Sequence, residues 1–410
     1  METRILLIYI FTYVGLYFSF YSLFTFFHGF SRLKNPVSKK QYSVTITVPA
    51  YNEEKTIERT ITSLLDLNYP QEYLDIIVVD DGSTDNTFAI AKKISGIRVF
   101  RKANGGKGSA LNFALKKSKG EIFGALDADS VAGPESLSKM VGYFDDLDVC
   151  AVTPSLKVEK PTNFLQKIQY VEYLFGVFLR KVFSFIDAIH VTPGPLTLYR
   201  KEFLLETGGF DEHNLTEDTE IALRIQSKNK RIENAIDAEV FTKTPRTFKP
   251  LFYQRLRWYV GFLNNVFKYR HLFRPRYKLL GMFILPSAFL SIGIVMFFVF
   301  YFFIKSILKV VQLFSNYNAV DFDLVTLIQN FKFDLFYIHF GPAFFLAFLS
   351  LALFLFFIYL GRRYSRERQS FTLAYPIYIV FYSAFFAFWW LAAGFWKLTH
   401  RKIVWGGRAL

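Results

Sequence analysis

The sequence predicts an α/β domain with a doubly wound parallel sheet, joined to about four membrane-spanning helices. Three observations predict it: strand and helix patterns alternate between residues 42 and 240, four long stretches lack charged residues, and basic residues gather beside those stretches. The chain of 410 residues is 52% apolar and 19% aromatic, which excludes a disordered protein. Its one cysteine, Cys150, excludes a disulfide scaffold and is expected to fill a gap in the core.

The predicted strands are short runs rich in Val and Ile that are bounded by Pro, Asp or Gly, at residues 43–48, 74–79, 97–100 and 121–126. Helical patterns lie between them, at residues 53–67, 86–94 and 108–117. This alternation is typical of a parallel sheet with helices on both faces. Such sheets bind ligands beyond the carboxyl ends of their strands, so residues that follow the strands are the first candidates for a site.

The predicted spans lack Asp, Glu, Lys and Arg, at residues 5–27, 279–304, 338–360 and 370–396. Each is longer than the roughly 20 residues that a helix needs to cross a bilayer. The first has too long an apolar region for a signal peptide and is expected to act as an anchor. Residues 316–337 contain several charged residues and are expected to form a loop with an interfacial segment.

The net charge of +15 comes from four basic patches beside the spans, at residues 32–40, 241–278, 361–369 and 397–408. Because basic loops stay in the cytoplasm, residues 28–278 and 361–369 are expected on that side of the cell membrane, in a multi-pass protein. Four spans would leave the basic tail outside, so either the last stretch does not fully cross or the tail departs from the rule. Positive charge that lies beside spans, and not on the domain, does not indicate a nucleic-acid partner.

Two amphipathic stretches adjoin the domain, at residues 164–185 and 248–269. Apolar residues of the first recur at intervals of four and three, which predicts a helix. Such a helix either packs on the core of the domain or lies in the headgroup plane of the membrane. The second stretch is basic and aromatic, which favours contact with anionic lipid.

Acidic motifs follow the predicted strands and open a later helix. They are Pro49-Ala50-Tyr51-Asn52-Glu53, Asp80-Asp81-Gly82, Asp127-Ala128-Asp129 and Thr216-Glu217-Asp218. Each alone is also compatible with a turn, a helix cap or a solvated surface. A fifth motif, Gln254-Arg255-Leu256-Arg257-Trp258, lies in the second amphipathic stretch.

Together and in this order, the motifs resemble those of the inverting family 2 glycosyltransferases with a GT-A (Rossmann-like) fold, over about residues 43–260. The Gln-x-x-Arg-Trp motif resembles the signature of the membrane-bound branch that makes cellulose, chitin, hyaluronan and poly-β-1,6-N-acetylglucosamine. One anchor before the domain and three spans after it are most similar to the bacterial poly-N-acetylglucosamine synthases. The resemblance implies an anchor at residues 1–41, a cytoplasmic GT-A domain at 42–247, an interfacial helix and basic linker at 248–278, and a membrane region at 279–410.

The resemblance also implies roles for single residues. Asp218 would be the catalytic base that deprotonates the acceptor hydroxyl. Asp129 would hold Mg²⁺ or Mn²⁺ together with Asp127, which neutralises the diphosphate of the donor. The other residues expected at the donor are Pro49, Tyr51, Glu53, Asp80, Asp81, Lys107, Gln254 and Arg257. Those expected at the acceptor are Glu217, Trp258 and Gly194.

Lys107 is also a candidate from its position, because it opens a predicted helix and helix N-termini attract phosphate. Its alternative is a solvated lysine in a turn. Trp258 offers an aromatic face to a sugar ring, and its alternative is a residue of the aromatic belt at the membrane surface.

The function expected from these features is transfer of N-acetylglucosamine from a UDP-sugar to a growing β-linked polysaccharide, coupled to export. Four spans are few for a polysaccharide channel, so we expect a small membrane subunit or further copies of the chain (a homo-oligomer) to complete one. Membrane lipids are also expected partners. The alternative is a single transfer to a lipid acceptor such as polyprenyl phosphate or diacylglycerol. A remote alternative is a transporter or scaffold with an inactive domain, although the predicted spans lack the ionisable residues that transporters carry.

Overall fold

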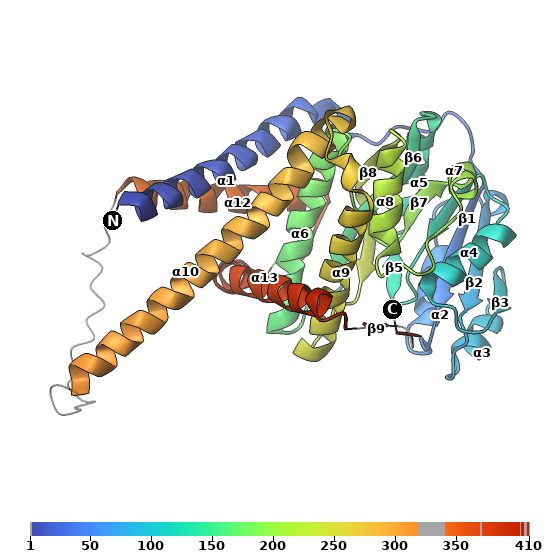
Figure 1. Ribbon diagram of the computed structural model, residues 1–410. Helices are drawn as coiled ribbons and strands as arrows, with labels where there is room; N and C mark the ends of the chain where they lie inside the picture. The colour runs from blue at the N-terminus through green and yellow to red at the C-terminus, as the bar shows by residue number, and fades with distance from the viewer. Residues whose placement is uncertain (1, 319–340, 370, 402, 406–407, 410) are drawn as a thin grey trace.

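The computed structural model describes residues 2–318, 341–369, 371–401, 403–405 and 408–409. An α/β domain lies on one side of the molecule, and long helices extend from its opposite side (Figure 1). The predicted loop at 316–337 and the start of the predicted span at 338–360 fall almost wholly outside the described residues.

An eight-stranded sheet forms the centre of the domain, in the order β3-β2-β1-β4-β7-β6-β8-β5. Its strands are β1 Val44–Ala50, β2 Leu74–Asp80, β3 Arg98–Arg101, β4 Ile122–Ala125, β5 Ser130–Ala132, β6 Val149–Val158, β7 Thr197–Arg200 and β8 Arg231–Thr242. The four predicted strands are confirmed as β1 to β4, and they pair in parallel. Ala50 lies beside Asp80 in the register, so the segments that follow β1 and β2 leave the sheet at one edge.

The prediction of a parallel sheet is confirmed for β1 to β4 and for β6 beside β8, and it is wrong for β7 and β5. Strand β7 pairs antiparallel with both β4 and β6, and β5 pairs antiparallel with β8. Parallel neighbours need a crossover that returns the chain to the same end of the sheet. Residues 43–126 supply such crossovers, whereas β7 follows β6 by way of α6 and joins the sheet between β4 and β6 in the opposite direction, which makes the sheet mixed.

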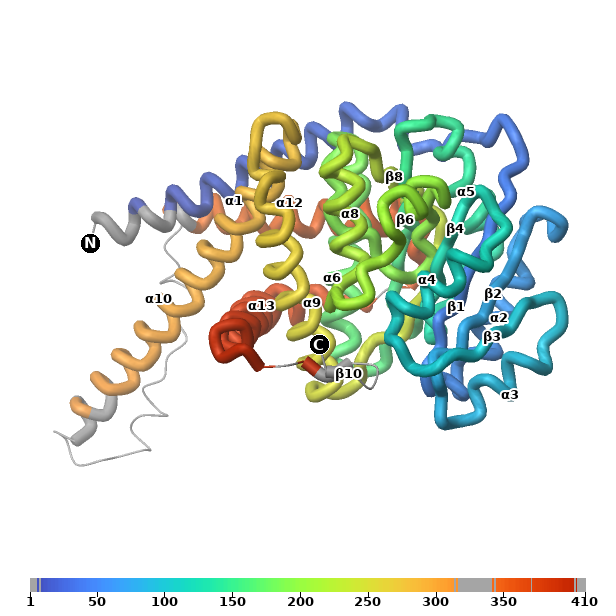
Figure 2. The backbone as a smooth tube through the Cα atoms, turned by 45° about the vertical axis from the view of Figure 1, so that its right-hand side comes forward, coloured from blue at the N-terminus to red at the C-terminus, as the bar shows by residue number. Residues whose placement is uncertain are grey.

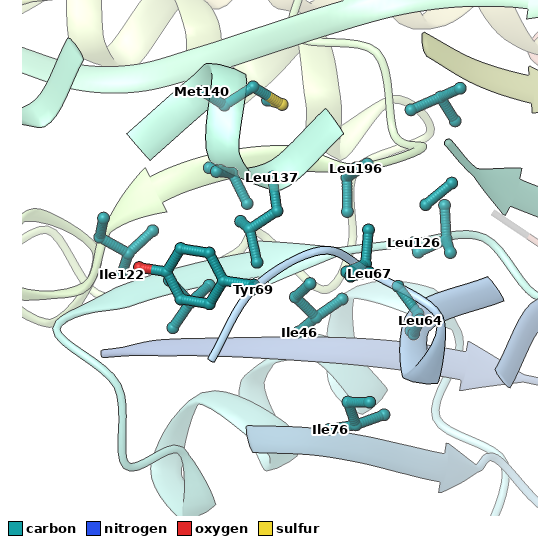
Figure 3. Packing of buried hydrophobic residues seen from close by; sticks show 14 of the residues in the cluster. Ile46, Leu64, Leu67, Tyr69, Ile76, Ile122, Leu126, Leu137, Met140 and Leu196 are labelled. Carbon is teal, nitrogen blue, oxygen red and sulfur yellow. The ribbon is translucent and has the colours of Figure 1, made fainter. Parts of the chain in front are cut away.

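Helices cover both faces of the sheet and bury alternate side chains of each strand. They are α2 Ile57–Leu65, α3 Thr87–Lys92, α4 Lys107–Lys117, α5 Ser136–Val141, α7 Lys201–Glu206 and α8 Glu217–Ser227. Along β2, Ile76 packs in one core with Ile46, Leu64 and Leu137 (Figure 3), and Ile77 packs in the other core. The predicted helices at 53–67, 86–94 and 108–117 are confirmed as α2, α3 and α4. Cys150 is buried in the second core, as expected.

Both amphipathic stretches are helices, α6 Phe164–Phe185 and α9 Phe248–Lys268. Helix α6 is covered on two sides. Lys181 Nζ donates to Asn234 O at 2.7 Å within the domain, whereas Phe178 stacks on Phe357 of α12 with ring centres 4.6 Å apart. Packing on the core of the domain therefore accounts for one face of α6, and packing on membrane-type helices for the other.

The four predicted spans correspond to four long apolar helices: α1 Glu2–His28, α10 Leu285–Asn318, α12 Pro342–Tyr364 and α13 Ala374–Leu398. Each is long and apolar enough to cross a membrane. Helices α1, α10 and α12 extend away from the sheet, whereas α13 crosses α6 and α9 (Figures 1 and 2).

Helix α13 contacts the domain side of the molecule at both ends. At its start, Ala374 is buried in a cluster with Val158 of β6 and Tyr170 of α6. At its end, Lys397 Nζ donates to Asn264 Oδ1 of α9 at 2.5 Å. Ile403 in the tail then packs against Leu215, which precedes α8. This helix lies along the layer formed by α6 and α9.

Candidate active site

A cavity of about 300 Å³ opens at the carboxyl edge of the parallel strands, where the motif residues meet. The predicted residues that line it are Pro49, Tyr51, Glu53, Asp81, Lys107, Asp127, Asp129, Glu217 and Arg257. They come from the segments after β1, β2 and β4 and from the first turns of α4 and α8, with α9 closing one side. The remaining predicted residues, Asp80, Gly194, Asp218, Gln254 and Trp258, do not line this cavity.

Asp80 and Asp81 end β2 and hold the neighbouring loop. Asp81 accepts hydrogen bonds from Gly105 N at 2.9 Å and Gly106 N at 2.6 Å, and from Lys102 Nζ at 2.7 Å. Asp80 is fully buried, and its Oδ2 lies 3.1 Å from Arg101 Nε. Asp81 reaches the cavity, whereas Asp80 stabilises the loop beneath it.

Asp127 and Asp129 form the acidic side of the cavity, with Glu53 near them. Burial, and next the charge of Asp127, raise the pKa of Asp129 to about 6, and Glu53 adds to the effect. Burial also raises the pKa of Glu53, with a contribution from Asp127. The negative charge around Asp129 and its burial both disfavour its ionised form, and a bound cation would stabilise that form.

Lys107 joins the two sides of the cavity. Its Nζ lies 2.6 Å from Asp127 Oδ1 and 3.1 Å from Glu217 Oε1. Burial disfavours its charge, but the carboxylates of Asp127 and Glu217 outweigh burial and raise its pKa. Gly194 lies close by, because a Cβ there would stand 2.6 Å from Lys107 Nζ. Lys107 is therefore a paired lysine at the start of α4, not a solvated lysine in a turn.

Glu217 and Asp218 open α8 on the other side of the cavity. Burial and the charge of Glu217 raise the pKa of Asp218 to about 6, while Lys107 and Arg257 act in the opposite direction. Burial alone would raise the pKa of Glu217, but Lys107 and Arg257 outweigh it and lower the value. Asp218 is half-buried, and its Oδ1 accepts a hydrogen bond from Thr219 N at 2.7 Å. The two adjacent carboxyl groups thus have pKa values that are shifted in opposite directions.

Helix α9 brings its motif against the start of α8. Arg257 Nη1 donates to Leu215 O at 3.0 Å. Gly261 allows the close approach, since a Cβ at this position would stand 2.4 Å from Thr216 Oγ1. Asn265 Nδ2 donates to the same Thr216 Oγ1 at 2.9 Å.

Gln254 and Trp258 lie on the same helix but outside the cavity lining. Gln254 Oε1 is buried and has no hydrogen-bond partner among the described residues. Trp258 is half-buried, with the Arg255 guanidinium 4.3 Å from its ring centre. The Arg255 side chain is paired with Glu172 of α6, at 2.7 and 3.0 Å.

Other lining residues escaped the motif reasoning: Glu212, Asn214 and Leu215 come from the loop before α8. This loop packs on the first turn of α4, where a Cβ at Gly108 would stand 3.1 Å from Glu212 Cα. Asn214 Nδ2 also donates to Asn265 Oδ1 of α9 at 2.7 Å. The loop has no strand-end signal, so only its position just before the Thr-Glu-Asp motif could have indicated it.

The mixed sheet places an acidic cluster and Lys107 at the carboxyl edge of its parallel strands, the edge at which open α/β sheets bind their ligands. Residues 45–208 match the family model described as Glycosyl transferase family 2. The chain therefore contains a family 2 glycosyltransferase domain, as the motif resemblance implied.

Similar proteins come from several organisms. The chain is 31% identical over 225 residues to a poly-beta-1,6-N-acetyl-D-glucosamine synthase of Staphylococcus aureus strain COL. This match covers 53% of the present chain and 54% of that protein. It is 30% identical over 261 residues to the enzyme of the same name from Staphylococcus epidermidis, with 61% and 63% covered. The chain thus matches a little over half of the length of these relatives.

A solved structure resembles the chain over most of its length. It is a mannosyltransferase from Pyrobaculum calidifontis, in complex with GDP-Man and Mn²⁺, with a TM-score of 0.54 and 18% identity. The match covers 96% of this chain and 100% of that one. At this identity the likeness shows the fold alone.

Proposed function

We propose that the chain is an inverting glycosyltransferase that moves N-acetylglucosamine from a UDP-sugar to a growing β-linked polysaccharide at the cytoplasmic membrane face. The observation that carries this proposal is the cavity in which Asp127, Asp129 and Lys107 face Glu217 of the Thr-Glu-Asp motif. The choice of sugar rests on the staphylococcal relatives, which are named for that polymer.

The donor side of the cavity would bind the nucleotide and its diphosphate. Asp81 and the backbone after β1 offer acceptors for the N–H and O–H groups of a nucleoside. Lys107 would pair with the diphosphate, at the N-terminus of α4, where backbone N–H groups also favour anions.

Asp127 and Asp129 fit a hard divalent cation, because burial and the charge of Asp127, which raise the pKa of Asp129, both disfavour a carboxylate that has no cation beside it. Among the described residues no group of three His, Cys, Asp or Glu is arranged to hold a metal ion. Mg²⁺ needs fewer protein ligands when a substrate phosphate completes its coordination, and one or two carboxylates suffice. A bound Mg²⁺ or Mn²⁺ would supply positive charge to the leaving diphosphate.

Asp218 would act as the base. An acceptor hydroxyl oxygen bonds to C1 of the donor sugar, the bond from C1 to the diphosphate oxygen breaks, and the hydroxyl proton passes to the Asp218 carboxylate. The raised pKa makes Asp218 a better proton acceptor than an exposed carboxylate, while it is still ionised at neutral pH. Glu217, Trp258 and Gly194 would contact the acceptor.

The packing of α9 on α13 is an argument for an acceptor that is bound at the membrane. Helix α9 carries Arg257 at the cavity and packs on α13, so the site adjoins the apolar helices. The basic residues beside those helices favour a cytoplasmic catalytic domain. A lipid acceptor would be consistent with the same layer, and the length of the product separates the two alternatives.

The test is incubation of the purified full chain with Mg²⁺ and single nucleotide-sugars, namely UDP-N-acetylglucosamine, UDP-glucose and GDP-mannose, followed by mass analysis of the products. Long chains from UDP-N-acetylglucosamine alone are expected, and none from the Asp218→Asn variant. One sugar attached to a lipid would replace the polysaccharide proposal with the lipid acceptor. If none of the three donors is hydrolysed or used for transfer, the proposed activity is overturned.

A further inference from the structure

A second cavity, lined by arginines, lies at the end of α12. Its volume is about 690 Å³, and it shares no lining residue with the candidate active site. Arg362 and Arg363 line it from the last turn of α12, and Arg366 and Arg368 from the loop that leads to α13. No role in the proposed transfer accounts for four arginines at this place.

The cavity lies where a membrane-type helix meets the catalytic domain. Lys157 Nζ of β6 donates to Ser365 O at 2.6 Å, and Arg366 Nη2 lies 3.5 Å from Asp237 Oδ2 of β8. Toward the middle of α12 the wall becomes apolar, with Leu355 and Ile358. The cavity therefore has a charged end at the domain and an apolar end along the helix.

The positive charge of the cavity is only partly neutralised. Among the described residues that line it, Glu367 is the one carboxylate. Its Oε1 accepts a hydrogen bond from Gln369 N at 2.7 Å, and its Oε2 lies 3.6 Å from Lys157 Nζ. Arg363 and Arg368 are exposed, and neither forms an ion pair within the part of the chain that the structure describes. Two guanidinium groups thus face the cavity without a carboxylate of their own.

We propose that this cavity binds the phosphate headgroup of an anionic phospholipid, with the acyl chains along α12. A guanidinium group donates two parallel hydrogen bonds to phosphate oxygens, a geometry that lysine cannot supply. Leu355 and Ile358 provide the apolar surface that an acyl chain needs and a free phosphate does not. Basic pockets at the ends of membrane helices are typical headgroup sites.

The experiment measures lipid retention by native mass spectrometry of the full chain, transferred to detergent from bicelles of equal phosphatidylglycerol and phosphatidylcholine. Wild-type protein is expected to retain phosphatidylglycerol selectively. The Arg363→Gln/Arg368→Gln variant is expected to bind it at least about tenfold more weakly, from the loss of charge-assisted hydrogen bonds between the two guanidinium groups and the phosphate. The matched control is Arg274→Gln/Arg276→Gln, which removes two exposed charges from the basic segment before α10 and is expected to retain the lipid.

If the Arg363→Gln/Arg368→Gln variant and the control lose the lipid equally, the retention comes from general charge and not from the cavity. If neither loses it, the cavity is not the binding site. Either result overturns the proposal. Displacement of the lipid by millimolar glycerol 3-phosphate would show a site for soluble phosphate and would also overturn it. The Arg363→Lys/Arg368→Lys variant keeps the charge and guards against misfolding of the first variant. It is expected to lose part of the retention, because lysine keeps the attraction but not the paired hydrogen bonds.

Discussion

The donor side and the acceptor side of the candidate site are built differently. The proposed donor side comes mainly from the ends of β1, β2 and β4, and both β2 and β4 pair with β1 in the first third of the chain. The proposed acceptor side comes mainly from α8 and α9, although Arg257 of α9 is proposed to contact the donor. There, Leu215 and Leu256 pack in one cluster with Ala393 of α13 and Ile403 of the tail. The proposed donor side thus rests mainly on neighbouring strands, whereas the proposed acceptor side also packs on the apolar helices.

The largest expected effect separates the two sides by function. Asp218→Asn removes the base from the acceptor side, and kcat is expected to fall by about 10³-fold or more. The affinity for the donor should stay within about twofold of the wild-type value, since Asp218 does not line the cavity of the candidate active site. Transfer assays and titration of the donor in calorimetry measure both. Equal loss of donor affinity and turnover would remove Asp218 from the role of base.

A change on the donor side should affect binding and turnover together. Asp129→Asn removes one of the two carboxylates expected to hold the cation, so donor affinity and kcat should both fall, each by about 10- to 100-fold. EDTA should stop transfer by the wild type, and Mg²⁺ or Mn²⁺ should restore it. Turnover that is unaffected by chelation would exclude Asp127 and Asp129 as metal ligands.

Two ion pairs of the same geometry test how far the acceptor side depends on packing. Arg255 and Glu172 form a bidentate pair between α9 and α6, with side chains 4% and 22% exposed. Arg59 and Glu159 form a bidentate pair on the sheet side, with 49% and 16% exposed. Glu172→Gln is expected to lower the free energy of unfolding by about 2–4 kcal/mol, because it leaves a buried guanidinium without its carboxylate.

The matched Glu159→Gln variant should cost no more than about 1 kcal/mol. Denaturant unfolding of both proteins measures the difference. Glu172→Gln should also raise the KM for the acceptor while leaving the KM for the donor unchanged, because Arg255 lies beneath Trp258. Equal effects of the two variants would contradict a special dependence of the acceptor side on helix packing.

The smallest expected effect is a shift in the pH profile. A base must be ionised, and the pKa of Asp218 is raised to about 6, so kcat should fall about tenfold per pH unit below that value and level off above it. Glu217→Gln removes a negative neighbour that raises this pKa, and the fall should move to lower pH. Lys107 and Arg257, which lower it, remain. A profile that moves to higher pH would contradict the assigned electrostatic coupling.

Among the residues predicted at the site, those that follow strands line the cavity more often than those on α8 and α9, for a physical reason. Strand ends and turns are local signals, and β1, β2 and β4 meet at one edge because parallel strands must. The acceptor side depends on contacts between distant residues. Gly261 against Thr216, and Arg255 against Glu172, leave no mark on nearby sequence.

Composition does not distinguish the long apolar helices from one another. Helices α12 and α13 are both long and apolar enough to cross a bilayer, and nothing in their local sequence separates them. Their contacts separate the two helices, because the start of α13 packs on α6 and its end is hydrogen-bonded to α9. The mixed order of the sheet beyond β4 escaped prediction in the same way, since β5 and β7 pair with strands that are distant in the sequence.

The path of α13 determines the parity of membrane crossings. A segment whose two ends touch the same domain returns the chain to the side from which it came. Helices α1, α10 and α12 then remain to cross a bilayer. If α1, α10 and α12 are the helices that cross, we expect the start of α1 and the basic tail on opposite sides, with Lys397 and Arg401 on the side of the other basic patches. The charge of the tail, which conflicts with four crossings, agrees with an odd number.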